Sequence, residues 1–542
     1  MRNQIGRIAT LFVILVSIAV PLWMLTSGGS HAREGFPLDD AWIHMVYARS
    51  VSQSGYLAYN PGIPSTGSTS PLWAYVLGLA HLLFPSAAGA LLAAKVLGIL
   101  FHVCMSLAAY RIVLLVSGSW PIALISGILL GTSPPLAASA ISGMEVSMGC
   151  ALALTGLYLY FRNKWLPAGI FFGLCGLTRP EFAALILVVW CDAARGFLRE
   201  KRPWRELVPL LLPPLIAGSL FMGWNLFANG RILTSSFYAK VVPQVATGFI
   251  TRIGSGLRII MKDSPLAGGL VWAGLLAPFL FKVREKRKIA VCFAGGVIYF
   301  LGNILVILPL DTSAYYYIRY LLPSMALLSV AVLAGWAAGS RAFIEKLTQA
   351  SPKAVPLWKV AGSAVLGITA LLLMISLSSG VVQWRLKYAR DCRNIDEVQV
   401  ALGKDIDRAF PPSAKIGTTD AGAINYFGGR FTVDLLGINT KEKLGETWNS
   451  PPLDAIVVFP AWVKVQKENT LAVVDEKTTA DYRVTRNPSM GTQVTIVCRS
   501  EKGEKVRDLR LTMLGVRASV RLNTMTGDEI DALKKRLREP SR

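Results

Sequence analysis

Two adjacent carboxylates are the first groups in the chain that could do chemistry. Asp39 and Asp40 are the one adjacent acidic pair before residue 381. A carboxylate in such a pair can act as a general base that removes a proton from an attacking hydroxyl, while its neighbour orients it. The same pair can also stabilise a helix N-terminus through the helix dipole. Residue type alone leaves both interpretations open.

The residues after this pair predict a short amphipathic helix along the outer membrane surface. Trp42, Met45 and Val46 recur at helical spacing and would face lipid or a protein core. The other face then carries the side chains that could contact a substrate, which are Asp39, Asp40, His44 and Arg49.

Cations and tyrosines in two later segments offer complementary chemistry. Residues 236–240 include Tyr238 and Lys240, and residues 311–320 include Arg319 among several tyrosines. The topology predicted below places both segments outside the cytoplasm, where cations are disfavoured. A phosphate bound by Lys240 and Arg319 would explain them. The alternative is an interfacial belt of aromatic rings with cations extending to water.

The sequence contains no motif for a metal or a nucleotide cofactor. A Walker loop, a Rossmann glycine fingerprint and an HExxH motif are absent, and the four histidines are scattered. We therefore expect no cofactor and no metal requirement. Five of the seven cysteines lie in apolar runs, whereas Cys392 and Cys498 lie in the polar C-terminal part and could form a disulfide.

The composition predicts an integral membrane protein. Of 542 residues, 53% are apolar and 16% are charged, and the mean hydropathy is +0.47; soluble domains have a far more polar composition. The net charge of +23 could suggest nucleic acid as a partner. Most of that excess, however, lies in short basic loops between apolar runs, which indicates positive-inside topology and a lipid bilayer as the partner.

Alternating apolar runs and basic loops predict a polytopic α-helical protein with about 11 to 13 transmembrane helices. Residues 8–26 form a retained anchor, and residues 28–70 form an outer loop that carries the Asp-Asp motif. Further crossings are expected near 206–228, 265–282, 289–308, 321–340 and 360–380. Between 71 and 194, six apolar pieces must give an odd number of crossings. Either 87–117 is two short crossings, which places Glu145 and Arg179 outside, or 165–194 is one long crossing.

The last part of the chain predicts a separate domain. After the transmembrane domain of residues 1–380, hydropathy falls, and residues 381–542 predict an extracytoplasmic α/β domain. Its amphipathic helix is expected at 394–410 and its strands at 415–419, 430–435, 454–459, 471–475 and 493–498. Asp420 follows the first of these strands and is either part of the site or a turn residue before a helix.

Several ordered motifs between residues 39 and 437 resemble GT-C membrane glycosyltransferases, in particular the arabinofuranosyltransferase-like enzymes of bacterial envelopes. They are Asp-Asp-Ala at 39–41, Gly-Met-Glu at 143–145, Thr-Arg-Pro-Glu at 178–181, Phe-Tyr-Ala-Lys at 237–240, Arg-Tyr-Leu-Leu-Pro at 319–323, Thr-Asp-Ala-Gly-Ala at 419–423 and Val-Asp-Leu-Leu-Gly at 433–437. Residues 65–68, Ser-Thr-Gly-Ser, depart from the arabinofuranosyl pattern.

The resemblance implies an inverting glycosyltransferase of a bacterial cytoplasmic membrane whose active site faces outward. It implies that a sugar passes from a polyprenyl-phosphate donor to a glycan or lipid-linked acceptor of the cell envelope. Carried over to this chain, it assigns the base to Asp39, with Asp40 as orienter or alternative base. It assigns the donor phosphate to Lys240, Arg319 and Tyr238, and further substrate contacts to His44, Arg49, Glu145, Arg179 and Asp420. The alternatives are a lipid-linked sugar transporter or flippase, an O-antigen polymerase or ligase, and a non-catalytic scaffold.

Overall fold

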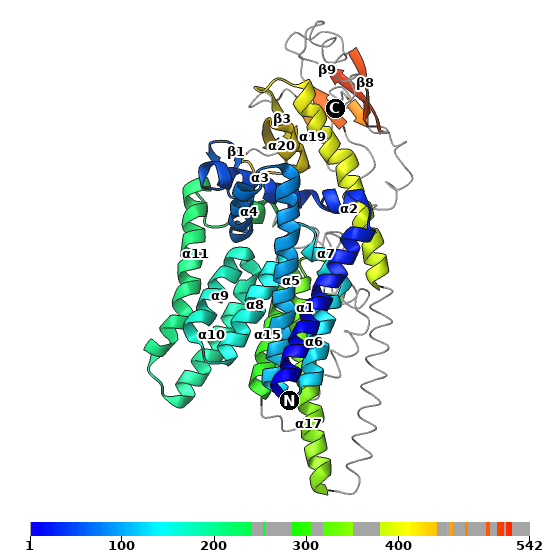
Figure 1. The fold of residues 1–542 in the computed structure, drawn as a ribbon. Coiled ribbons are helices and arrows are strands. Elements are labelled where there is room, and N and C mark those ends of the chain that lie inside the picture. Colours follow the sequence, from blue (N-terminus) through cyan, green and yellow to red (C-terminus); the bar gives the residue numbers. More distant parts are fainter. Residues whose placement is uncertain are drawn as a thin grey trace. The chain divides into compact units, whose positions relative to one another are not determined.

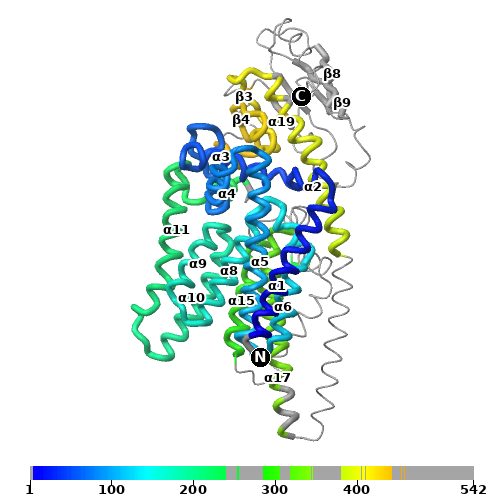
Figure 2. The backbone as a smooth tube through the Cα atoms, in the orientation of Figure 1, coloured from blue at the N-terminus to red at the C-terminus, as the bar shows by residue number. Residues whose placement is uncertain are grey.

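A computed structural model gives the fold of the protein. It describes residues 2–240, 253–254, 285–304, 318–350 and 380–441, together with Leu453 and the five strands β5 to β9. Figure 1 shows the elements, with the residues that are not described as a thin grey trace, and Figure 2 shows the course of the backbone.

The chain divides into two compact units, and each consists of several stretches of sequence. Unit 1 comprises Met1–Ser27, Lys95–Met222 and Pro243–Arg385, and unit 2 comprises Gly28–Ala94, Gly223–Val242 and Leu386–Arg542. This division differs from a single cut at residue 380, because two outer segments fold with the C-terminal residues.

Unit 1 consists of apolar helices that pack side by side, and the first is α1 (Arg2–Ser27). The others lie along the chain as α5 (Ala87–Ser117), α6 (Trp120–Thr132), α7 (Pro134–Ala140), α8 (Val146–Phe161), α9 (Trp165–Thr178), η1 (Pro180–Phe182), α10 (Ala183–Glu200), η2 (Trp204–Leu207), α11 (Val208–Asn229), α15 (Lys286–Gly302) and α17 (Leu322–Ala350). Helix α8 packs on α9, α15 on α17, α1 on α6, and α10 on α15. Helices α5 and α11 begin or end in unit 2.

The described residues contain four helices long and apolar enough to cross a membrane, or five if the bent pair α6 and α7 is one span. The anchor expected at 8–26 is confirmed as the helix α1. The crossings expected at 206–228 and 321–340 coincide with α11 and α17, which are long and apolar enough to span a membrane. The helix expected at 289–308 is α15, which ends at Gly302 and is not one of these four. The segments 265–282 and 360–379 lie outside the described residues, so the full number of crossings stays a prediction.

Both of the ways we considered to obtain an odd number of crossings before residue 195 are wrong. Residues 87–117 form one continuous helix, α5, because no glycine or proline turn interrupts the apolar run. Residues 165–194 form two helices, because Pro180 cannot continue α9 and the chain turns at Arg179. The remaining short piece is α4 (Pro71–Leu83), which belongs to unit 2 and packs on α3. Its 13 residues span about 20 Å, close to the length of α9, so its packing on α3 and not its length distinguishes it.

Unit 2 joins residues 28–70, which are predicted to lie outside the cytoplasm and are called the outer loop here, to the C-terminal sheet. This loop holds α2 (Ser30–Glu34), α3 (Asp39–Ser54), β1 (Ala58–Asn60) and β2 (Ile63–Pro64), α4 follows it, and a later segment of unit 2 holds α12 (Ser235–Lys240). The helix expected after Asp40 is confirmed. Its apolar side chains Trp42, Met45 and Val46 are buried. Trp42 packs against Phe36 and against the rings of Tyr426 and Phe427, at centroid distances of 5.1, 5.2 and 4.7 Å.

The C-terminal part is an α/β domain, as expected. A helical run from residue 380 continues through the π-helical turn η5 (Asp396–Val400) into α19 (Ala401–Ala409). The five expected strands are confirmed as β3 (Lys415–Thr418), β4 (Phe431–Asp434), β5 (Ala455–Val458), β6 (Ala472–Val474) and β7 (Thr495–Cys498). Two strands were missed, β8 (Arg507–Met513) and β9 (Val516–Leu522), because charged residues break their apolar pattern.

The seven strands form one sheet in the order β4-β3-β5-β7-β6-β9-β8. The strands β4, β3 and β5 are parallel, and the short helix α20 (Ala423–Gly428) connects β3 to β4. Parallel strands need such a crossover. The turn before α20 therefore lies at the carboxyl end of β3, where Asp420 follows the strand.

The disulfide considered between Cys392 and Cys498 is not formed. Cys392 is a fully buried thiol in the helical run before η5. Its Sγ atom donates to the carbonyl oxygen of Gly35 at 3.7 Å. This thiol is therefore part of the packing between the C-terminal part and the start of the outer loop, both within unit 2.

Substituting Gly98 should test the packing inside unit 1. A Cβ atom at Gly98 in α5 would overlap the carbonyl oxygen of Ala140 at the end of α7. We expect Gly98→Ala to lower stability by about 1 to 3 kcal/mol, the usual cost of overpacking. Thermal unfolding of the detergent-purified protein would measure it. Gly218→Ala in α11, where nothing lies within 4 Å, is the control and should leave the midpoint unchanged or higher. Equal midpoints for both variants would contradict the packing of α5 on α7.

Candidate active site

Asp39 is the first residue of α3, and its carboxylate binds the start of a different helix. Oδ2 accepts the N–H of Gly422 at 2.6 Å, and Oδ1 accepts the N–H of Ala423 at 2.7 Å. These amides lie at the N-terminus of α20, which lacks a capping side chain of its own. The carboxylate therefore supplies in trans the oxygen that a capping residue normally provides. A Cβ atom at Gly422 would overlap the carbonyl oxygen of Asp39, so the close approach requires glycine.

A second carboxyl group lies against Asp39. Asp420 is hydrogen-bonded to Asp39, and its Oδ2 accepts the side-chain amide of Gln399 at 2.7 Å. The two acids are only 8% and 7% exposed. Burial, and next the negative charge of Asp420, raise the pKa of Asp39 well above its ordinary value. Burial also raises the pKa of Asp420, and the charge of half-buried Asp40 adds to this.

The outer loop is fastened to the C-terminal segment around this pair. The hydroxyl of Tyr59 donates to the carbonyl of Ala421 at 2.6 Å. The side-chain amide of Asn60 donates to the carbonyl of Thr432 at 2.8 Å and accepts the N–H of Thr432 at 2.9 Å. The pairing copies the two hydrogen bonds of a strand neighbour, so the loop and β4 are held in fixed register.

Two of the side chains predicted to contact a substrate, Arg49 and His44, are packed inside unit 2. Arg49 donates to the carbonyl of Tyr426 at 2.8 Å and to Asn425 Oδ1 at 3.2 Å, and it stacks on the ring of Tyr426. This arginine therefore fastens α3 to α20. His44 is buried at 6% exposure. The polar face expected on α3 is thus largely turned into unit 2.

The divergent segment 65–68 is part of the same packing. Ser65 Oγ donates to the carbonyl of Asn439 at 2.7 Å, and the Tyr47 hydroxyl donates to Asn439 Oδ1 at 3.0 Å. Thr66 shares a hydrogen bond of 2.7 Å with Ser235, and Ser236 donates to the carbonyl of Gly67 at 2.6 Å. Sequence patterns missed these small hydroxyl side chains, although their concentration at 65–70 and 234–236 was a signal.

These bonds attach α12 to the outer loop, and α12 carries two of the predicted phosphate ligands. Tyr238 is half-buried, packs edge-on against Phe237, and lies beneath the guanidinium of Arg231, 4.9 Å from its ring centroid. Lys240 is the last residue of α12. The side chain of Lys240 lies outside the described part of the structure, so its role as a phosphate ligand stays a prediction.

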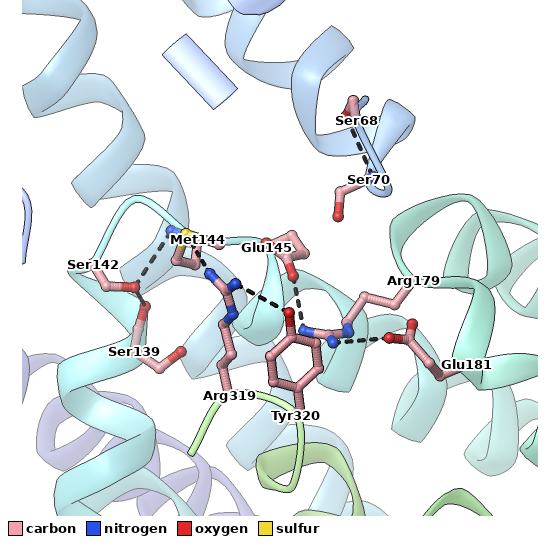
Figure 3. A network of polar contacts seen from close by, with 10 residues as sticks. All are labelled: Ser68, Ser70, Ser139, Ser142, Met144, Glu145, Arg179, Glu181, Arg319 and Tyr320. Atoms are coloured by element: carbon pink, nitrogen blue, oxygen red, sulfur yellow. Dashed lines mark hydrogen bonds and ion pairs between the residues drawn. The ribbon is translucent and has the colours of Figure 1, made fainter. Parts of the chain in front are cut away.

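In unit 1, three other predicted residues meet in one buried network (Figure 3). Arg179 donates to Glu145 Oε1 at 2.9 Å and to Glu181 Oε1 at 3.0 Å. Its guanidinium lies 4.8 Å from the ring centroid of Tyr320. Arg319 lies on the other side of that ring and donates to the Tyr320 hydroxyl at 3.1 Å and to Met144 Sδ at 3.7 Å.

Helix ends and turns build this network. Glu145 follows a turn at Gly143, whose φ is 78°, and precedes α8; Arg179 lies between α9 and η1; Arg319 precedes α17. The sequence motifs singled out Glu145, Arg179 and Arg319 separately and did not assign a role to Glu181 or Tyr320. Two glutamates beside Arg179 balance the two arginines, which makes their burial tolerable.

No group of three or more His, Cys, Asp or Glu side chains in the described ranges could hold a metal ion. The carboxylates of Asp39 and Asp420 accept hydrogen bonds from backbone amides and from Gln399.

Comparison with known proteins identifies the fold. Residues 393–506 match a family described as a domain of unknown function, DUF8728. No curated protein matches the chain by sequence. The crystal structure of ArnT from Cupriavidus metallidurans in the apo state has 14% sequence identity and a TM-score of 0.53, with 90% of this chain and 98% of that chain covered. The same protein bound to undecaprenyl phosphate has 12% identity and a TM-score of 0.53, with 91% and 99% covered. The similarity spans both units and establishes that the chain has the fold of the GT-C membrane glycosyltransferases, as its motifs suggested.

Proposed function

We propose that the protein is a membrane glycosyltransferase that moves a sugar from a polyprenyl-phosphate donor to a cell-envelope acceptor. The observation that carries this is Asp39, a buried acid at the start of the first outer helix of a GT-C fold, held by two backbone amides. The structural neighbour ArnT binds undecaprenyl phosphate. This supports a polyprenyl phosphate as the carrier of the donor sugar.

In the proposed reaction Asp39 is the general base. The acceptor O–H bond breaks, its proton passes to the Asp39 carboxylate, and the acceptor oxygen bonds to the anomeric carbon of the sugar. The bond between that carbon and the phosphate oxygen breaks, and the polyprenyl phosphate leaves with the electron pair. A raised pKa suits this role, because a base is most effective when its pKa lies near the working pH. Attack from the face opposite the phosphate would invert the anomeric centre.

The leaving phosphate needs positive charge, which Arg319 and Lys240 would supply. Arg319 is held by Tyr320 and Met144 at the start of α17, and its planar donor group suits a phosphate. Arg179 is already occupied by two glutamates and is therefore the poorer phosphate ligand. We assign it to the support of Tyr320, on whose other side Arg319 lies.

The short helix α4 supports an outward-facing site. If α4 does not cross the bilayer, five crossings (α5, the bent pair α6–α7, α8, α9 and α10) lead from the outer loop to the basic loop at 195–205. This places Arg162 and Lys164, between α8 and α9, in the cytoplasm, as the positive-inside rule favours. It places Glu145, Arg179 and the outer loop on the extracytoplasmic side. The orientation fits a bacterial cytoplasmic membrane with both the site and the C-terminal domain outside.

Cysteine labelling should test this topology. Ser413 is exposed in the loop before β3, and Arg205 is exposed between α10 and α11. We expect an impermeant thiol reagent added to intact cells to label Ser413→Cys and not Arg205→Cys, relative to the parent protein. Permeabilised cells should label both. The reverse pattern in intact cells would show that the protein is inverted and that the proposed site faces the cytoplasm.

Removing the base should abolish transfer. We expect Asp39→Asn to lower turnover by about 10² to 10⁴, since the amide cannot accept the proton. The assay would use the purified protein in proteoliposomes, with a panel of polyprenyl-phosphate sugars as donors. Asp407→Asn, a 57% exposed carboxylate on α19, is the matched control and should retain activity. Normal turnover by a folded Asp39→Asn variant would rule out Asp39 as the base.

Neutralising Arg319 should weaken donor binding. We expect Arg319→Gln to raise the KM for the donor by about tenfold to a hundredfold, the usual worth of a hydrogen bond to a charged group. The control is Arg287→Gln, which removes an arginine paired with Asp192 in the middle of α10 and should leave the KM unchanged. An unchanged donor KM in Arg319→Gln would contradict the phosphate assignment.

A further inference from the structure

We propose that Asp420, contributed by the C-terminal domain, is a positioning residue that holds the carboxyl group of Asp39 and strengthens it as a base. The inference rests on the proposed function, because it concerns the base of that reaction. It makes the active site composite: one acid comes from the first outer loop, and a second comes from a segment almost 400 residues further along the chain.

The position of Asp420 is tightly determined. Its main-chain N–H donates to Thr418 Oγ1 at 3.1 Å, and the same hydroxyl donates to the carbonyl of Asp420 at 3.2 Å. Gln399 donates to its carboxylate at 2.7 Å from η5, a single π-helical turn within a longer helical run. Such turns are often found at functional sites, because they redirect one side chain. Asp420 is therefore fixed through both its main chain and its side chain.

A turn residue would not need this arrangement. A carboxylate in a turn is stabilised by exposure to water or by local backbone amides, as Asp434 is by the N–H groups of Leu436 and Asn439. Asp420 instead points its carboxyl group at another buried carboxyl group, which costs free energy whenever both are ionised. A pairing this unfavourable is typical of sites in which two acids share a proton.

The shared proton gives Asp420 a chemical role. Asp39 titrates beside the carboxyl group of Asp420, and the negative charge of ionised Asp420 raises the pKa of Asp39. When Asp39 takes the proton from the acceptor hydroxyl, the new O–H group donates to Asp420. The proton then leaves to water, and the pair returns to its starting state. The other titratable groups around the pair in the described structure are Asp40 and Tyr59, and burial keeps Tyr59 neutral.

The pH dependence of kcat/KM tests the proposal. Ionised Asp39 is required, so activity is lost as the pH falls through its pKa. Asp420→Asn removes the neighbouring charge and should displace this acid limb to lower pH, with a lower maximal rate because the base is weaker. Asp420→Glu should restore the limb toward the wild-type position. Asp434→Asn, an equally buried acid that does not contact Asp39, should leave the limb in place. An unmoved limb in Asp420→Asn would overturn the proposal.

A second variant covers the case in which Asp420→Asn does not fold. Gln399→Leu keeps the side-chain volume and removes the hydrogen bond that stabilises ionised Asp420, so the pair should hold its proton more tightly. Its acid limb should therefore move to higher pH, opposite to Asp420→Asn. No displacement in Gln399→Leu would count against the proposal.

An infrared titration separates failure of this inference from failure of the proposed function. The carbonyl stretch of a protonated buried carboxyl group can be followed with pH in reconstituted protein without any substrate. We expect a band in the wild type that disappears in Asp39→Asn and titrates at lower pH in Asp420→Asn. Absence of transfer with every polyprenyl-phosphate sugar would refute the function, while this shift would still support the coupled pair. Identical titrations of wild type and Asp420→Asn would refute the pair itself.

Discussion

The carboxylate of Asp39 is the interaction on which unit 2 depends, because a buried negative charge must be satisfied by donors that the chain cannot supply locally. Its two oxygens are directed toward α20, where the first amides of that helix also need acceptors. The carboxylate of Asp39 accepts the hydrogen bonds that the first amides of α20 must donate, and these amides stabilise its negative charge. This reciprocity fixes the first outer loop against the turn that follows β3, and it leaves no room for a side chain at residue 422. A substitution that disturbs one segment should therefore be felt in the other.

The neighbouring contacts reinforce the same junction in different ways. Asn60 pairs with the main chain of Thr432 as a strand would, Arg49 ties α3 to α20, and Trp42 fills the space between them with aromatic rings. Polar and apolar contacts thus coincide at one interface. The C-terminal domain is consequently not an independent appendage. It completes the core of the outer loop, and this explains why unit 2 is assembled from three separate stretches of sequence.

In unit 1, charged side chains are buried among apolar helices and need partners of opposite charge. Arg179 is 3% exposed and is neutralised by Glu145 and Glu181, while Tyr320 separates it from Arg319. Removing one member would leave an uncompensated buried charge, which costs far more than a surface ion pair contributes. The helix break at Pro180 allows this network to form, because it frees Arg179 from the regular geometry of α9 and places Glu181 two residues further on.

The sequence by itself determined the class of the protein and most of its elements. Apolar runs of bilayer length, basic loops and alternating short strands have strong local signals, so the helices α1, α11 and α17, the helix after Asp40 and five strands were correctly predicted. The ordered motifs also indicated the GT-C fold. What only the tertiary structure decided depends on contacts between residues far apart in the chain. No local pattern shows that Asp39 meets Asp420, that Arg49 is occupied by α20, or that Cys392 packs on Gly35. The two strands beyond residue 506 were missed because charged residues interrupt their alternation. Crossing parity failed for a related reason, since hydropathy measures how apolar a helix is and not whether it packs across the bilayer or, like α4, against a neighbouring outer helix.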